Sequence, residues 1–81
     1  MSPRLLTRAG CGLCDEFADA WRAAFPGVDL PRFDVDRDAA LRQRYGDTVP
    51  VLLDGADQPV CSVHFDHAAC LPVARALGAA V

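Results

Sequence analysis

The 81-residue sequence predicts one α/β domain over residues 1–81, with the element order β-α-β-α-β-β-α and a four-stranded mixed sheet. Two observations lead to this fold class. Short apolar runs alternate with segments whose apolar residues recur at helical spacing. The first two strand candidates are separated by a helix and should run parallel, whereas only a turn-rich segment separates the last two, as in an antiparallel hairpin. We expect helices on both faces of the sheet.

The first strand and helix are predicted from residues 5–25. Residues 5–7 form a short apolar run, and the turn at residues 9–10 follows it. From Leu13 to Phe25, large apolar side chains recur every four residues and charged ones lie between them, a pattern typical of an amphipathic helix. The Pro-Gly pair at residues 26–27 should end this helix.

A second strand and helix are expected next. Residues 28–35 have strand character, with a break in alternation at Pro31 that suggests an edge position or a bulge. Asp36 and Asp38 are candidate N-caps for a helix, and Gly46 is suited to the position after its last residue.

The last part of the chain predicts a hairpin and a final helix. Residues 48–53 and 60–63 are the strand candidates, and the segment between them is rich in turn residues. Asp66 can cap a last helix that runs to residue 77. Pro72 lacks a backbone N–H, so this helix should begin later than the cap suggests or kink.

Cys11 and Cys14 form a Cys-x-x-Cys between the first strand and the first helix. A thiolate attacks disulfides, so the first cysteine needs a lowered pKa, and a helix N-terminus stabilises negative charge. Arg8 can add a positive charge nearby. Cys14 lies about one turn further along, closer to the buried side. We therefore predict Cys11 as the nucleophile and Cys14 as the resolving thiol.

The element order with a Cys-x-x-Cys after the first strand is that of the thioredoxin fold, and Val49 and Pro50 strengthen this resemblance. In the thioredoxin superfamily a cis-proline lies beside the reactive pair, and the backbone of the preceding residue binds a thiol substrate. The resemblance implies that Pro50 is this proline and that Val49 makes the backbone contact. Gly12 and Leu13, between the two cysteines, would complete the substrate surface with Arg8.

The chain resembles more closely the small bacterial glutaredoxin-like proteins that carry a Cys-x-Leu-Cys motif. The matching positions span nearly the whole chain: Leu6, Arg8, Cys11, Leu13, Cys14, Asp15, Asp34, Asp36, Leu41, Tyr45, Gly46, Val49, Pro50, Val51, Leu52, Phe65 and Asp66. This resemblance implies a thiol–disulfide oxidoreductase without a bound cofactor or metal. The resemblance implies glutathione as a co-substrate. Because residues 60–66 lack the glycine pair that usually holds glutathione, a protein thiol is the other expected partner.

Two other functions remain open. One is a metal-binding or metallochaperone-like module that uses the Cys-x-x-Cys with a downstream histidine or cysteine. The downstream candidates Cys61, His64, His67 and Cys70 recur every third residue and are residue types that bind zinc or copper. A non-catalytic adaptor with the same fold is the other. We expect Cys61 and Cys70 to be small apolar residues of the core, or to form an auxiliary disulfide under oxidation.

Net charge and hydropathy argue against nucleic acid and membranes as partners. The formal net charge is −3, and the sequence has no basic stripe of the kind that neutralises phosphates, so nucleic acid is not an expected partner. No apolar run has the length of a membrane span, and the short, charged start does not have the form of a signal peptide. We expect a cytoplasmic monomer.

Overall fold

The structure, a computed structural model that describes residues 2–80, has the predicted order of strands and helices. The elements are β1 (Arg4–Thr7), α1 (Gly12–Ala24), β2 (Arg32–Asp34), the 3-10 helix η1 (Val35–Arg37), α2 (Ala39–Tyr45), β3 (Val51–Leu53), β4 (Pro59–Ser62) and α3 (His67–Ala76). The four strands form one sheet in the order β2-β1-β3-β4. β1 pairs in parallel with β2, and the other two pairings are antiparallel. The predicted fold class is confirmed.

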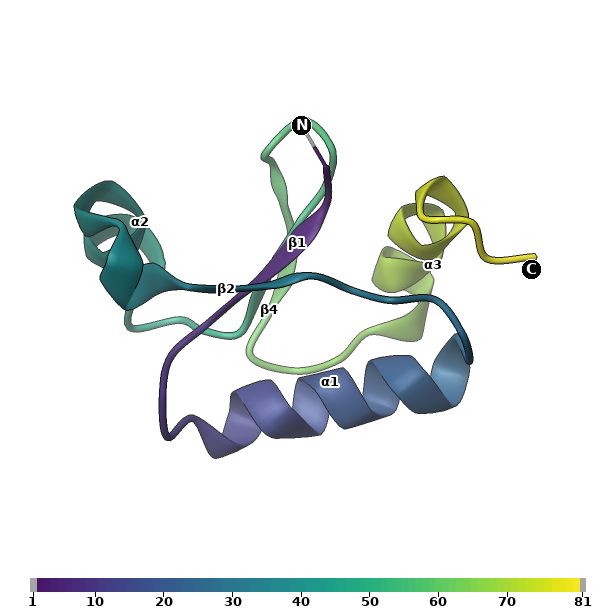
Figure 1. The fold of residues 1–81 in the computed structure, drawn as a ribbon, viewed down its shortest axis with the longest axis horizontal. Coiled ribbons are helices and arrows are strands. Elements are labelled where there is room, and N and C mark those ends of the chain that lie inside the picture. Colours follow the sequence, from purple (N-terminus) through teal and green to yellow (C-terminus); the bar gives the residue numbers. More distant parts are fainter. Residues whose placement is uncertain (1, 81) are drawn as a thin grey trace.

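The sheet separates two apolar clusters, because successive residues of a strand point to opposite faces. Leu5 and Leu52 lie in one cluster, with the buried side chains of α1 and α3. Their neighbours Leu6 and Val51 lie in the other, with Val35 of η1 and the partly buried side chains of α2. Helices α1 and α3 therefore cover one face and α2 the other (Figure 1).

The second strand is shorter than predicted. Only residues 32–34 pair with β1, whereas residues 28–31 are irregular and Val35 begins η1. The reason lies in the hydrogen bonds of this segment. The carbonyl of Val28 accepts a hydrogen bond from the Trp21 indole at 2.8 Å, so the chain is held to α1 there, and contact with β1 begins at the carbonyl of Pro31.

The second helix begins at the second of its two candidate caps. The Asp38 carboxylate accepts hydrogen bonds from two backbone N–H groups of α2, whereas Asp36 lies in η1. Gly46 ends α2 in a right-handed conformation, with φ −56°. A Cβ atom there would lie 2.5 Å from the Arg42 carbonyl oxygen, so close packing rather than positive φ favours glycine at this position.

The prediction that the last helix begins later than its cap is wrong. α3 begins directly after its cap Asp66 and contains Pro72 in its interior. Pro72 lacks the N–H that would bond the Ala68 carbonyl, and because both residues are exposed, water can take the place of this donor. The third strand also begins three residues later than predicted.

None of the helices in residues 2–80 combines the length and apolar character that crossing a bilayer requires.

Candidate active site

The Cys-x-x-Cys segment forms the N-terminus of α1. Cys11 is the N-cap residue with extended backbone (φ −89°, ψ 104°), and its Sγ accepts a hydrogen bond from the backbone N–H of Cys14 at 3.1 Å. Gly10 makes the preceding turn with φ +73°, a conformation that favours glycine. The free N–H groups and the dipole at a helix N-terminus stabilise negative charge. This position therefore suits an anionic sulfur.

The two sulfurs differ in access. Cys11 and Cys14 are joined by a disulfide, with their Cα atoms 5.2 Å apart. Cys11 is partly exposed, whereas Cys14 has no exposed surface and packs in the core. A reagent from solution can reach the sulfur of Cys11 but not that of Cys14.

Val49 and Pro50 lie at the end of the sheet from which β1 leads to the cysteines. Leu6 of β1 is paired with Val51 of β3 in an antiparallel register, so Pro50 lies beside the carboxyl end of β1. The peptide bond between Val49 and Pro50 is cis. The Pro50 carbonyl accepts a hydrogen bond from the Val63 N–H at 2.8 Å, which ties this loop to the segment after β4.

A groove of about 370 Å³ begins at Leu13, between the two cysteines. Leu13 is 41% exposed, the large apolar residue that is most open to solvent among the described residues. The ring of Phe65 meets the ring of Phe17 edge-on, with centroids 5.4 Å apart, and so holds the opposite wall against α1. The groove is lined by Leu13, Glu16, Phe17, Ala20, Val63, His64 and Phe65.

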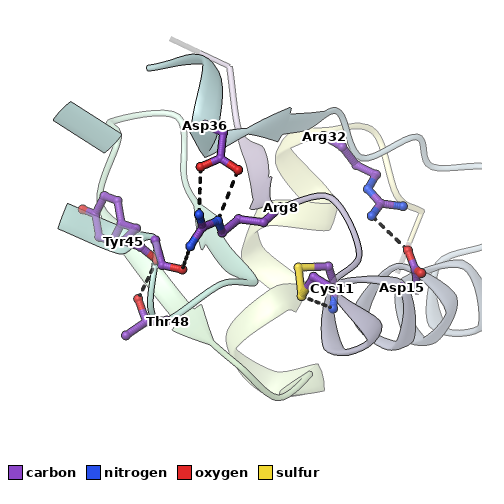
Figure 2. The surroundings of a disulfide bond; sticks show 9 residues. Arg8, Cys11, Asp15, Arg32, Asp36, Tyr45 and Thr48 are labelled. Atoms are coloured by element: carbon purple, nitrogen blue, oxygen red, sulfur yellow. Dashed lines mark hydrogen bonds and ion pairs between the residues drawn. A yellow bond between two sulfur atoms is a disulfide. The ribbon is translucent and has the colours of Figure 1, made fainter. Parts of the chain in front are cut away.

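Arg8 connects the cysteine loop to the α2 side of the molecule. Its guanidinium pairs with the Asp36 carboxylate, at 3.0 Å from Nη2 and 3.3 Å from Nε, and donates a third hydrogen bond to the Gly46 carbonyl at 3.4 Å. Figure 2 shows this group turned toward Asp36 rather than toward the disulfide. Both side chains remain 39% exposed. Arg8 therefore fixes the strand end from which the loop leaves.

Acidic side chains follow Cys14 along α1, and two of them are paired. Asp15 accepts a hydrogen bond from Arg32 of β2 at 3.1 Å, as Figure 2 shows, and Asp19 pairs with Arg22. Their negative charges are thus partly balanced by neighbouring arginines. Repulsion of an anionic sulfur by α1 is correspondingly reduced.

The downstream cysteines and histidines do not gather into a metal site. Within residues 2–80, no three side chains of His, Cys, Asp or Glu lie close enough together to hold a metal ion. His64 lines the groove, and His67 packs its ring 5.1 Å from that of Phe25. Cys61 and Cys70 have free thiols.

Three residues with a part in the site were missed from the sequence. The sequence identifies Asp36 as a candidate helix cap and as a position of the family motif, but nothing in it indicates that Asp36 pairs with Arg8, which is 28 positions away. Val63 adopts φ +68°, a conformation that β-branched residues rarely occupy, so no propensity predicts it. Phe65 was assigned only through a motif; its contact with Phe17 depends on how α3 returns to α1.

The sequence and the fold of this chain are similar to those of known proteins. The model of the family described as "Glutaredoxin-like domain (DUF836)" matches residues 4–70. Uncharacterized proteins Mb0520 of Mycobacterium bovis and Rv0508 of Mycobacterium tuberculosis are each 38% identical over 79 residues, covering 88% of this chain and 80% of theirs. Protein Ne2328 from Nitrosomonas europaea has a similar solution structure, with a TM-score of 0.75 and 26% identity over 88% of this chain and 87% of its own. Protein XcR50 from X. campestris has a TM-score of 0.68 and 31% identity over 93% and 97%.

Proposed function

Because the chain belongs to the glutaredoxin-like domain family, we propose that it is a thiol–disulfide oxidoreductase with Cys11 as nucleophile and Cys14 as resolving thiol. One observation carries the proposal. The two sulfurs are bonded across the first turn of a helix, with the N-cap sulfur partly exposed and its partner buried. This asymmetry is what an attacking and a resolving thiol require.

The proposed reaction has two exchanges. In the reduced protein, the Cys11 thiolate attacks one sulfur of a substrate disulfide, the substrate S–S bond breaks, and one substrate thiolate leaves. Cys14 then gives up its proton and attacks the Cys11 sulfur, which releases the second substrate thiolate and closes the Cys11–Cys14 disulfide. Two electrons pass from the protein to the substrate. Two molecules of a small thiol such as glutathione, or a dithiol reductase, would return the pair to its reduced form.

The substrate surface that we propose consists of Leu13, Gly12 and the backbone of Val49, with the buried Pro50 behind them as the residue that shapes this backbone. Leu13 is exposed at the mouth of the groove, and Gly12 adds no side chain over Cys11. Within residues 2–80, neither the N–H nor the carbonyl of Val49 has a hydrogen-bond partner, so both can pair with the backbone of a thiol substrate. The Val49 side chain packs against the core on the α2 side, which fixes the orientation of this backbone.

Arg8 has a different part in the proposal. Because its charge is already paired with Asp36, its main effect would be to hold the cysteine loop, and its exposed side can also attract the carboxylate of a substrate such as glutathione. We propose glutathione or a protein thiol as the partner, with a monomeric enzyme acting in the cytoplasm, where thiols stay reduced.

Turnover of a small mixed disulfide by the purified protein, with glutathione as the reductant, tests the proposal. We expect activity in the wild-type protein and a loss of at least about 1,000-fold in Cys11→Ser, because a hydroxyl is a far weaker nucleophile than a thiolate. Ala23→Ser, which introduces a serine at an exposed position of α1 outside the pair, is the control and should keep its activity.

Two other results would replace the proposal with one of its alternatives. Stoichiometric zinc or copper in the purified protein, lost on Cys11→Ser, would indicate a metal-binding module. Neither turnover nor bound metal, with a Cys11 that reacts no faster than a free cysteine, would indicate an adaptor.

A further inference from the structure

A second pair of thiols lies between β4 and α3. The Sγ atoms of Cys61 on β4 and Cys70 on α3 are 3.8 Å apart, and neither belongs to the Cys11–Cys14 disulfide. Cys61 is partly exposed on a strand at the edge of the sheet, and Cys70 has no exposed surface. This pair thus repeats the asymmetry of the first one, with one accessible and one buried sulfur.

We propose that Cys61 and Cys70 are a second thiol–disulfide couple of this protein, which a small disulfide such as oxidised glutathione closes into a disulfide between β4 and α3. A disulfide requires the sulfurs to approach to about 2.05 Å. At 3.8 Å the two sulfurs are already in van der Waals contact, and they must approach further for the bond to form. β4 is paired along one side only, through β3, and can adjust to the new bond.

The interaction between the two thiols prepares Cys61 for attack. Either thiol can donate the hydrogen bond between the two sulfurs, and Cys70 is the donor when Cys61 is ionised. This hydrogen bond lowers the pKa of Cys61 below its ordinary value, against the opposing effect of burial. The same hydrogen bond, together with burial, raises the pKa of Cys70. Cys61 is therefore the sulfur that ionises first and that solvent reaches first.

The reaction balances with the small disulfide as the oxidant. The Cys61 thiolate attacks one sulfur of the small disulfide, whose S–S bond breaks and releases one thiolate. Cys70 then loses its proton and attacks the Cys61 sulfur, and a second thiolate leaves as the Cys61–Cys70 bond forms. The protein loses two electrons and two protons, and the small disulfide becomes two thiols.

The second couple adjoins the groove at the first. The segment between Cys61 and Cys70 contains Val63, which is bonded to the Pro50 carbonyl, and Phe65, which packs on Phe17 of α1. A Cys61–Cys70 disulfide would close a covalent ring that includes this wall of the groove.

Tryptic mapping of the wild-type protein can follow the two couples separately. Cleavage after Arg8 and Arg22 places Cys11 and Cys14 on the peptide 9–22, and cleavage after Arg44 and Arg75 places Cys61 and Cys70 on the peptide 45–75. The fully reduced, folded protein is incubated with oxidised glutathione, quenched with acid, denatured, alkylated with N-ethylmaleimide and digested. We expect both peptides without label, each lighter than its reduced form by two hydrogen atoms.

Label on both cysteines of the peptide 45–75, with none on the peptide 9–22, would overturn the proposal while leaving the first couple intact. Two variants test the order of attack. Cys70→Ala should accumulate a glutathione adduct at Cys61, whereas Cys61→Ala should keep Cys70 as a free thiol. A Cys70→Ala protein that forms no adduct would also overturn the proposal, because Cys61 would not be the attacking sulfur.

Discussion

The two cysteine pairs place an accessible and a buried sulfur side by side in different ways. Cys11 and Cys14 belong to one turn of α1, so the local geometry of a helix start brings them together. Cys61 and Cys70 come from an edge strand and a helix, and the packing of α3 on the sheet brings them together. The first pair is thus determined locally and the second by tertiary contacts.

This difference also determines what stabilises a thiolate in each pair. Cys11 lies among the N–H groups at the N-terminus of α1 and accepts a hydrogen bond from the backbone of Cys14. Cys61 has the Cys70 thiol as its main stabilising partner. Backbone donors persist when a neighbouring side chain is replaced, whereas a side-chain donor is lost with its residue. The first pair should therefore be the more robust of the two.

The largest expected effect separates the buried members of the two pairs. Cys14→Ser should lower the rate of reduction of a protein disulfide, such as those of insulin, by about 100-fold or more, because the resolving thiol no longer attacks from within the molecule. Cys70→Ala should leave this rate unchanged. The measurement is the rate of insulin reduction with a fixed reductant, and equal losses in the two variants would remove the distinction between the pairs.

The second prediction concerns pH. In a Cys11→Ser/Cys14→Ser protein, the rate at which Cys61 is alkylated should reach half its maximum at a lower pH than that of a cysteine in an unstructured peptide, since the hydrogen bond from Cys70 lowers the pKa of Cys61. Cys70→Ala removes the donor and should move this midpoint to higher pH. Stopped alkylation followed by mapping of the peptide 45–75 gives both profiles. Coincident profiles would show that Cys70 does not stabilise the Cys61 thiolate.

A smaller effect is expected on stability. Cys70→Ser places a hydroxyl in the apolar core and should cost about 1–2 kcal/mol of the free energy of unfolding. Cys61→Ser, at a partly exposed site, should cost at most about 0.5 kcal/mol. Urea unfolding under reducing conditions measures both. The reverse order would mean that Cys61 rather than Cys70 is the core member of the pair.

The smallest expected effect is at the ion pair that holds the first cysteine loop. A double-mutant cycle with Arg8→Gln and Asp36→Asn should give a coupling energy of about 0.5 kcal/mol or less, because both side chains are 39% exposed and water screens them. High salt should reduce it further. A coupling energy that salt does not change would contradict this, because it would mean that the Arg8–Asp36 pair is shielded from water.

The sequence predicted those features that depend on local patterns. The spacing of Leu13, Phe17 and Trp21 defined α1, and the Cys-x-x-Cys before it marked the helix start. The element order followed from segment lengths and turn residues, and the four-stranded mixed sheet with helices on both faces followed from that order. Asp38 and Asp66 cap their helices as their residue type favours.

Features set by tertiary contacts could not be predicted in the same way. We predicted a strand over residues 28–35, but β2 is shorter. The Trp21 indole bonds the Val28 carbonyl, and this contact holds the start of the segment against α1 instead of the sheet. The proximity of Cys61 and Cys70 depends on how α3 packs, and their spacing along the chain does not by itself bring them together. The left-handed conformation of Val63 has no signal in the residue itself.

The most direct test of the central claim is the position at which a mixed disulfide forms. Reduced Cys14→Ser protein is exposed briefly to oxidised glutathione, quenched with acid and mapped with trypsin. Attack by an accessible N-cap thiolate predicts that the first adduct appears on the peptide 9–22, at Cys11. A peptide 9–22 that stays unmodified, while a matched Cys11→Ser protein forms an adduct at Cys14 just as fast or faster, would contradict the account.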